Sequence, residues 1–414
     1  MPERKRILFV GEGVTLAHVA RPVAFASTLN PLEFDVRVAC DERYRNIVED
    51  EGLDWTSIHT VSSQDFLEAL QKGQLVYTRE VLNRYIEDDL RLLHESKPDV
   101  VVGDFRLSLQ VSARRAQIPY ASICNAYWSP WTQVDYELPS HSITKYIGLN
   151  AASAIFRVLQ PAFFKSHTRT IDEMRRAANL EPVGTKLGLA YMEADFVLFP
   201  DVPELVPTVD VPADRHCYVG PAEWSPKMDL PEWWDRVPSG KPIVYVTMGS
   251  SGDKAILPKV LEALVGQDYS ILVATAGVDA GSLPANFFCA PYLPGRDAAR
   301  RASVVISNGG SPTTYQALAQ GAPLVGIPGN MDQHLCMNQV RKFGAAISIR
   351  SDQLSTEAVR NGVAKAITDP SLRAAAQKLQ HIFAKTLAER RLEKALRDLS
   401  DHKTGASHPG GVAA

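Results

Sequence analysis

The 414-residue sequence predicts an α/β protein made of two Rossmann-like domains, each a doubly wound parallel sheet, that face each other across a central cleft. Three observations lead to this fold. Continuously apolar, β-rich runs alternate with helical patterns in both halves, as in strands that helices cover on both faces. A stretch rich in proline and tryptophan at 217–242 separates the halves and is expected to be an interdomain linker. Ligands of such sheets lie beyond the carboxyl ends of the strands, so a site between the domains is expected.

The first domain is predicted at 1–216. Its expected strands are 7–10, 34–39, 55–60, 100–103, 120–124 and 196–199. Its expected helices are 17–29, 43–51, 79–95 and 108–116. From 128 to 181 the pattern is weaker, with clustered aromatics followed by an amphipathic stretch. We interpret this region as a lid or an acceptor-lining helix pair, with a weak membrane-surface contact or ordinary core as the alternatives.

The second domain is predicted at 243–400, where the alternation resumes. Its expected strands are 243–248, 270–275, 286–290, 303–306 and 323–327. A charged, Ala- and Leu-rich helix is expected at 377–399. The remaining residues, 401–414, are mostly small and include glycines, which predicts a disordered tail.

Bulk composition excludes several classes of protein. With 45% hydrophobic and 22% charged residues the chain resembles an ordinary soluble globular protein, and a net charge of −3 gives no reason to expect a nucleic-acid partner. Five scattered cysteines without a Cys-x-x-Cys pair favour a reducing cytoplasm over a disulfide framework or a metal knuckle. The first apolar run, 7–10, is too short for a signal peptide or a membrane span. The oligomeric state stays open.

The most informative segment begins where the expected strand 303–306 ends. Gly309 and Gly310 lead into a helix whose first turn offers free backbone N–H groups, which make a cradle for an anion. Gln316 follows about one turn later, and Asp332 and Gln333 follow the next strand. This order of groups fits a diphosphate flanked by two hydroxyl-rich rings, as in a nucleotide sugar. Tight packing alone is the alternative explanation for the glycine pair.

Longer segments carry a resemblance to a known family. The run SNGGSPTTYQALAQGAPLVGIPGNMDQ resembles the donor-binding signature of the UDP-glycosyltransferase family. Four other segments are similar to that family in the same chain order: LAHVARPVAFASTL, PDVVVGDF, IVYVTMGSSGD and APYLPG. The resemblance implies the GT-B fold, with the acceptor on the N-terminal domain and the nucleotide-sugar donor on the C-terminal domain.

The resemblance implies a catalytic pair. His18 stands in the position of the family's general base, which takes the proton of the acceptor hydroxyl as that oxygen attacks the anomeric carbon in an inverting transfer. Asp104, directly after the strand 100–103, matches the carboxylate that orients the imidazole and stabilises its cation. Helix capping by His18 and loop binding by Asp104 are the alternatives without catalysis.

The resemblance also implies the donor site. Five residues of the glycine turn would hold the diphosphate: Asn308, Gly309, Gly310, Ser311 and Thr313. Ser250 would reach the phosphates from the opposing turn. Tyr292 would stack on the base and Gln316 would bind the ribose. Asp332 and Gln333 would hold hydroxyl groups of the donor sugar.

Four positions depart from the family pattern. Asn308 replaces a histidine, Pro312 removes one amide, Gln316 replaces a glutamate and Gly295 replaces a glutamine. These departures leave the donor open between a UDP-linked and a TDP-linked sugar. Because no Asp-x-Asp pair stands where a metal could bridge the diphosphate, the sequence predicts a metal-independent reaction without a cofactor beyond the donor.

The sequence therefore favours an inverting glycosyltransferase that moves a sugar from a nucleoside diphosphate to a hydroxyl of a small or lipid-like acceptor. A nucleotide-sugar 2-epimerase of the same fold and a catalytically silent sugar-nucleotide binder or partner subunit remain alternatives. Gly11-x-Gly13 suggests a nicotinamide-dependent oxidoreductase, but Leu16 occupies the third glycine position and Asp41 lies too far along. A glycosidase is disfavoured because the pattern supplies a nucleotide cradle and not two facing carboxylates.

Overall fold

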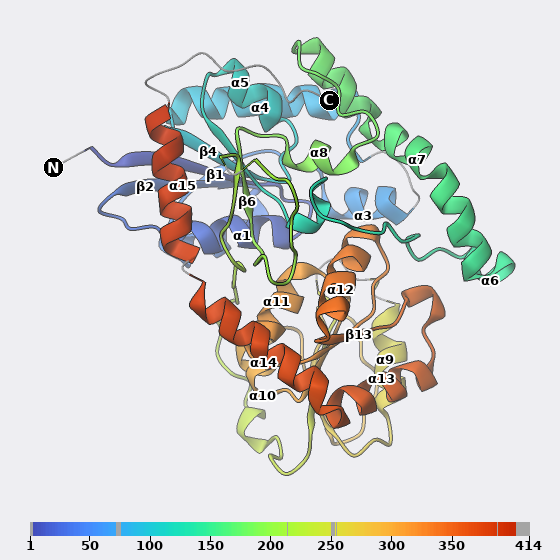
Figure 1. Ribbon diagram of the computed structural model, residues 1–414. Helices are drawn as coiled ribbons and strands as arrows, with labels where there is room; N and C mark the ends of the chain where they lie inside the picture. The colour runs from blue at the N-terminus through green and yellow to red at the C-terminus, as the bar shows by residue number, and fades with distance from the viewer. Residues whose placement is uncertain are drawn as a thin grey trace.

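The computed structural model describes residues 3–71, 76–212, 214–249, 253, 255–386 and 388–402. It confirms two α/β domains, each built on a parallel sheet (Figure 1). Ser250, assigned above to the phosphates, lies outside the described residues, as does 403–414 of the expected tail. Among the described residues no helix is both long and apolar enough to cross a bilayer.

The first sheet has seven strands in the order β3-β2-β1-β4-β5-β6-β7, all parallel. The strands are β1 (Lys5–Gly11), β2 (Phe34–Cys40), β3 (Asp54–Ser57), β4 (Val100–Asp104), β5 (Tyr120–Ile123), β6 (Phe196–Phe199) and β7 (His216–Tyr218). The helices of this part are α1 (Ala17–Ala26), α2 (Arg45–Glu49), α3 (Ser63–Gln71), α4 (Arg79–Ser96), α5 (Leu109–Arg115), α6 (Thr144–Ile147), α7 (Leu149–Ala177) and α8 (Leu187–Met192).

The second sheet has six parallel strands in the order β10-β9-β8-β11-β12-β13. They are β8 (Ile243–Thr247), β9 (Ser270–Ala274), β10 (Phe287–Ala290), β11 (Val304–Ser307), β12 (Leu324–Gly326) and β13 (Ala346–Ser348). The helices that follow in the chain are α9 (Ile256–Leu264), α10 (Gly295–Arg301), α11 (Ser311–Ala319), α12 (Met331–Phe343), α13 (Thr356–Thr368), α14 (Pro370–Lys385) and α15 (Ala388–His402).

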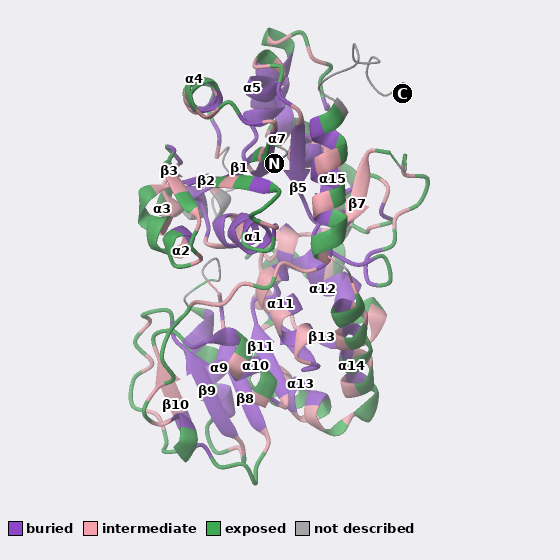
Figure 2. Cartoon of the chain, turned by 90° about the vertical axis from the view of Figure 1, so that its left-hand side faces the viewer, coloured by how far each residue is buried: buried purple, intermediate pink, exposed green. Residues whose placement is uncertain are grey.

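Both faces of each sheet are covered, which explains the unbroken apolar runs. In β1, alternate side chains pack with α1 on one face and with α4 and α5 on the other. In the second sheet, α9 and α13 cover one face, while α10, α11, α12 and α14 cover the other. Figure 2 shows the buried residues concentrated in the strands of both sheets. The apolar cluster between the second sheet and α10, α11, α12 and α14 continues into the first domain. It joins Tyr127 and Phe199 of the first domain to Tyr315 and Leu335 of the second, so it packs the two domains together.

Two features of the chain path differ from the sequence-based expectation. The strands β7 and β13 were not anticipated, because each is only three residues long and lies at a sheet edge. The helix expected at 377–399 is two helices, and α15 packs on the first domain through Leu392 and Leu396, although the predicted boundary groups it with the second. The apolar face of α15 packs near β4 and β7, on the same face of the first sheet as α1 (Figure 1). It extends through His402, two residues into the stretch predicted to be disordered.

Candidate active site between the two domains

His18 and Asp104 lie together because of the strand order. β1 and β4 are neighbours, and their register places Gly11 beside Asp104 at the carboxyl edge of the sheet. The loop after β1 then returns His18 at the start of α1. Its Nδ1 is 2.7 Å from Asp104 Oδ1, with 20% of the imidazole side chain exposed and 1% of the carboxylate side chain. A carboxylate can only accept, so this contact requires the proton on Nδ1 and leaves the lone pair on Nε2.

Arg21 is a third member of this group that the sequence analysis did not single out. Its Nε and Nη2 donate to the two oxygens of Asp104 at 2.8 and 2.7 Å, a bidentate pair that is buried. Burial alone would lower the pKa of Arg21, but Asp104 raises it above its ordinary value. The available signal was spacing, because a residue three positions after His18 lies on the same face of a helix.

The aromatic ring of Phe105 stacks on the face of the His18 imidazole. The two rings stack with centroids 4.5 Å apart and planes 9° apart. Phe105 has a φ of 59°, in the left-handed region that non-glycine residues rarely adopt. Its ring is enclosed by those of Phe66, Tyr77 and Tyr191. The orientation of His18 is therefore fixed by stacking as well as by Asp104.

A buried charged cluster stands next to this ring. Arg106 Nη1 donates to Glu12 at 3.1 Å and its Nε donates to Asp89 at 2.9 Å, and all three side chains are fully buried. Tyr85 Oη donates to Glu12 at 2.8 Å. Burial raises the pKa of Glu12 to about 7 in spite of the nearby guanidinium. The cluster ties the loop after β1, which leads to His18 in α1, to the loop after β4, which follows Asp104 directly.

Asn125 connects this group to the second domain. Its Oδ1 accepts from Arg21 Nη1 at 2.6 Å and from Ser311 Oγ at 3.1 Å, and Ser311 belongs to the glycine turn. Its Nδ2 donates to the buried carboxylate of Asp201 at 3.0 Å, which also accepts from Tyr315 Oη of α11. Asn125 follows β5, the neighbour of β4, so its place at a strand's carboxyl end was the signal that could have identified it.

The glycine turn between β11 and α11 combines a left-handed residue with backbone amides at the start of a helix. Gly309 has a φ of 79°, and a side chain there would meet Met337 at 2.4 Å. Gly310 is the N-cap of α11, and its N–H donates to Asn308 Oδ1 at 3.2 Å. Within the described part of the chain, the amides of Ser311 and Thr313 have no hydrogen-bond partner. These amides lie at the positive end of the helix dipole.

Asp332 and Gln333 occupy the first turn of α12. Asp332 Oδ1 accepts from Trp128 Nε1 at 2.8 Å and from Tyr127 Oη at 3.2 Å, two residues of the first domain. Gln333 is buried, and its Oε1 accepts from the backbone N–H groups of Gly329 and Asn330 in a capping box. The oxygen of Gln333 is thus engaged by the helix cap, while the Asp332 carboxylate bridges the two domains.

Two of the departures from the family pattern lie against each other. A Cβ at Gly295 would be 2.3 Å from Gln316 Oε1, so the missing side chain makes room for that amide. Gln316 Nε2 donates to the carbonyl of Trp224 at 3.0 Å. Tyr292, three residues before Gly295, is 61% exposed, so its ring is not held in the core.

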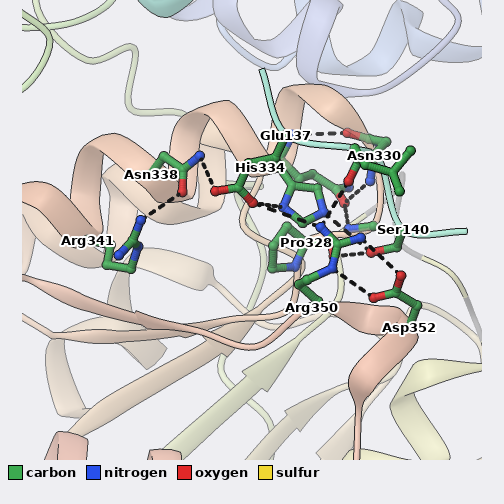
Figure 3. Close-up of polar contacts among 12 residues, drawn as sticks. Glu137, Ser140, Pro328, Asn330, His334, Asn338, Arg341, Arg350 and Asp352 are labelled. Atoms are coloured by element: carbon green, nitrogen blue, oxygen red, sulfur yellow. Dashed lines mark hydrogen bonds and ion pairs between the residues drawn. The ribbon is translucent and has the colours of Figure 1, made fainter. Parts of the chain in front are cut away.

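A segment before α6 joins the first domain to the second. Figure 3 shows Glu137 directed toward His334 and Asn338 of α12. The contact with His334 lowers the pKa of Glu137. Three further contacts follow along the segment: Arg350 Nη1 to Leu138 O at 2.9 Å, Ser140 N to Gly329 O at 2.8 Å, and Thr144 Oγ1 to Asp352 Oδ2 at 2.9 Å. The start of α6 is therefore anchored on the second domain.

An apolar cavity of about 300 Å³ adjoins the site. Trp128, which donates to Asp332, is one of its walls. The other lining side chains come mainly from the region 130–189: Pro130, Tyr136, Gln160, Pro161, Phe164, Thr185, Lys186, Leu187 and Leu189, with Gly188. This volume is at the lower end of the range for small-molecule pockets.

Comparisons with known proteins show which sequences and folds this chain is similar to. The model of the erythromycin biosynthesis protein CIII-like C-terminal domain matches residues 258–390. The chain is 43% identical over 397 residues to a PGL/p-HBAD biosynthesis glycosyltransferase of Mycobacterium tuberculosis (strain ATCC 25177 / H37Ra), covering 95% of this chain and 92% of that protein. It is 42% identical over 403 residues to a PGL/p-HBAD biosynthesis rhamnosyltransferase of Mycobacterium bovis (strain BCG / Pasteur 1173P2), covering 97% and 89%.

Among solved structures, the spinosyn rhamnosyltransferase SpnG has a similar fold, with a TM-score of 0.66 and 18% identity over 95% of this chain and 100% of that one. Both mycobacterial relatives are glycosyltransferases, and neither is an epimerase, so the 2-epimerase alternative is not supported.

Proposed function

Because the chain belongs to the glycosyltransferase family that includes the mycobacterial PGL/p-HBAD biosynthesis enzymes, we propose that it moves a sugar from a nucleoside diphosphate to a hydroxyl of an apolar acceptor, with inversion at the anomeric carbon. One observation carries this proposal. An unbroken chain of contacts runs from His18 through Asp104, Arg21 and Asn125 to Ser311 of the glycine turn. The residue proposed as the base and the turn proposed as the anion cradle come from different domains and are linked by these contacts.

In this mechanism His18 Nε2 accepts the acceptor's hydroxyl proton. The electron pair of the former O–H bond then forms a bond from the acceptor oxygen to the anomeric carbon. At the same time the bond from that carbon to the phosphate oxygen breaks. Asp104 stabilises the imidazolium that results. The stacking on Phe105 and the hydrogen bond to Asp104 keep Nε2 in a single direction, which reduces the reorganisation needed at the moment of transfer.

The departing diphosphate carries the electrons of the broken bond. Negative charge grows on it in an oxocarbenium-like transition state, and we assign its stabilisation to the amides of Ser311 and Thr313 at the start of α11, which have no partner among the described residues. The positive end of α11 supplies the potential that a metal ion supplies in other transferases. We therefore assign the cradle a metal-independent role in leaving-group departure.

For the donor we favour a thymidine diphosphate sugar. The Gln316 amide nitrogen is engaged with Trp224, which leaves Oε1 as an acceptor for one ribose hydroxyl. A 2′-deoxyribose presents one free hydroxyl there, whereas the ribose of UDP presents two. The similarity to an enzyme named as a rhamnosyltransferase adds a deoxyhexose as the sugar to be tested first.

The acceptor is assigned to the cavity beside Trp128. Its walls include the rings of Tyr136 and Phe164, so an aromatic or aliphatic acceptor would lose little hydrogen bonding on entry. Because Trp128 also donates to Asp332, the cavity wall and the start of α12 are linked. An acceptor hydroxyl that leaves the cavity on this side would approach the sugar carried by the donor.

Three measurements test the proposal. In thermal unfolding, TDP at about 100 times its dissociation constant should stabilise the protein by about 2.7 kcal/mol, and UDP at the same concentration should stabilise it less. His18→Ala should keep the TDP shift while turnover falls by roughly 10²- to 10⁴-fold, whereas His94→Ala, at an exposed site on α4, should keep both. Unchanged turnover in His18→Ala would remove His18 from the role of base, and a product of retained anomeric configuration, seen by NMR, would exclude inversion.

A further inference from the structure

The helix pair α6 and α7 carries an apolar surface that no other element of the described residues covers. Half of the exposed large hydrophobic side chains in the described part of the chain lie between 143 and 159: Ile143, Tyr146, Ile147, Ile155, Val158 and Leu159. Tyr146 is 85% exposed and Val158 is 79% exposed. Figure 1 shows α6 and this half of α7 at the outer edge of the molecule.

The periodicity of α7 gives this surface a direction. Ala151, Ile155, Val158 and Ala162 follow one another at spacings of four, three and four, so they form one exposed stripe about 16 Å long. The opposite face packs inward through Phe156 and Phe164. The first half of α7 therefore carries apolar side chains on its outer face as well as on its inner face, with polar residues such as Ser153 and Arg157 between them. An exposed apolar stripe of this kind is expected to have a partner.

Charge identifies the kind of partner. The whole stretch 138–171 contains no aspartate or glutamate but four basic residues, in a chain whose net charge is −3. These residues are Lys145, Arg157, Lys165 and Arg169. All four are exposed, and none forms an ion pair with another described residue. Lys165 and Arg169 continue the exposed stripe toward the C-terminal end of α7, at spacings of three and four from Ala162.

We propose that this surface, formed by α6 and residues 149–169 of α7, docks on an anionic lipid bilayer. An apolar stripe inserts at the level of the headgroups, Tyr146 lies at the interface, and the basic residues bind the anionic headgroups. Contact between two copies of this face would bring like charges together, which disfavours a second copy as the partner. The docking does not rest on the proposed activity, because it needs neither donor nor acceptor.

The position of the surface suggests what the docking achieves. Gln160, Pro161 and Phe164 of α7 line the apolar cavity, so one helix borders both the cavity and the docking surface. The start of α6 is held on the second domain through Thr144 and Asp352. A docked protein would therefore present the cavity to the lipid phase, from which an acceptor with an apolar chain can enter.

Vesicle flotation tests the docking. The wild-type protein should float with phosphatidylcholine vesicles that contain phosphatidylglycerol and should float less with phosphatidylcholine alone. Val158→Asp combined with Leu159→Asp should lower the bound fraction by roughly tenfold or more, and Lys165→Glu combined with Arg169→Glu should lower it only on the anionic vesicles. Leu32→Asp, at a residue 82% exposed elsewhere, is the matched control and should bind as the wild type does.

Fold integrity is checked by near-UV circular dichroism, which all variants should share. Equal flotation of the wild type and the Val158 and Leu159 variant would overturn the proposal, as would absence of wild-type binding. Size-exclusion chromatography with light scattering, carried out without lipid, tests the other refuting outcome. A wild-type dimer that becomes a monomer in the Val158→Asp and Leu159→Asp variant would show that this face binds a second copy. None of these readouts depends on glycosyl transfer, so failure of the docking is separate from failure of the proposed activity.

Discussion

Arg21→Met is expected to destabilise the protein strongly, because it leaves the carboxylate of Asp104 buried without its bidentate partner. The guanidinium makes two hydrogen bonds to Asp104 and one to Asn125, and the two paired side chains are 9% and 1% exposed. Removing one member of a buried pair costs about 3–5 kcal/mol. Since single domains are stable by about 5–15 kcal/mol, this loss is roughly a fifth or more of the free energy of unfolding.

A second substitution separates charge from packing. In the double variant Arg21→Met with Asp104→Asn no charge is left unpaired, so the loss relative to the wild type should fall by about 2 kcal/mol or more. The recovery should be limited to stability, because the amide at 104 no longer selects the tautomer of His18 that a base requires. Turnover of the double variant should therefore stay as low as that of Asp104→Asn alone.

Urea unfolding followed by circular dichroism measures the three variants, with free energies taken from the midpoints at a common slope. A cost below about 1 kcal/mol for Arg21→Met would show that Asp104 is not held by this pair. A double variant no more stable than Arg21→Met would show that the loss comes from packing and not from the uncompensated carboxylate.

Three further predictions concern other parts of the site. Tyr315→Phe removes a donor from buried Asp201 and should cost about 1–3 kcal/mol in unfolding experiments, and an unchanged midpoint would contradict this link between the domains. Burial raises the pKa of Glu12 from 4.5 to about 7, so its contribution to the free energy of unfolding is full below pH 4.5 and is lost as the pH rises through 7. Glu12→Gln should therefore flatten the dependence of that free energy on pH between 4.5 and 7. An unaltered slope in the variant would refute this. Gly309→Ala forces a left-handed residue against Met337, so it should lower the melting temperature and reduce TDP binding measured by calorimetry, whereas wild-type affinity would show that the turn does not form the cradle.

Periodicity and turn chemistry were enough to predict both sheets. Apolar runs such as β4 are read easily because both faces of a parallel strand are buried. The edge strands β7 and β13 gave no such signal, since their residues are mostly only half-buried and neither strand reads as an unbroken apolar run. The return of α15 to the first domain was also out of reach, because its amphipathic pattern shows that a face is buried but not which sheet it covers.

For the site, the sequence identified groups that extend from turns but missed the groups between them. His18 and Asp104 were paired in advance through the resemblance, and strand order brings them within 2.7 Å. Arg21 was treated as a helix residue, because a buried guanidinium is recognisable only when its partners are known. The contact between Gln316 and Gly295 was likewise hidden, since the two departures are far apart in the sequence but touch in space.

The path of α15 makes the first domain discontinuous, because residues 388–402 complete a core that starts at β1. The chain consequently passes between the halves twice, once after β7 and once after α14, so any relative movement of the halves must be accommodated by both connections. A fragment that stops at 216 would expose to water the apolar surface of the first sheet on which Leu392 and Leu396 pack. A self-sufficient first half would need the C-terminal helix spliced directly behind β7.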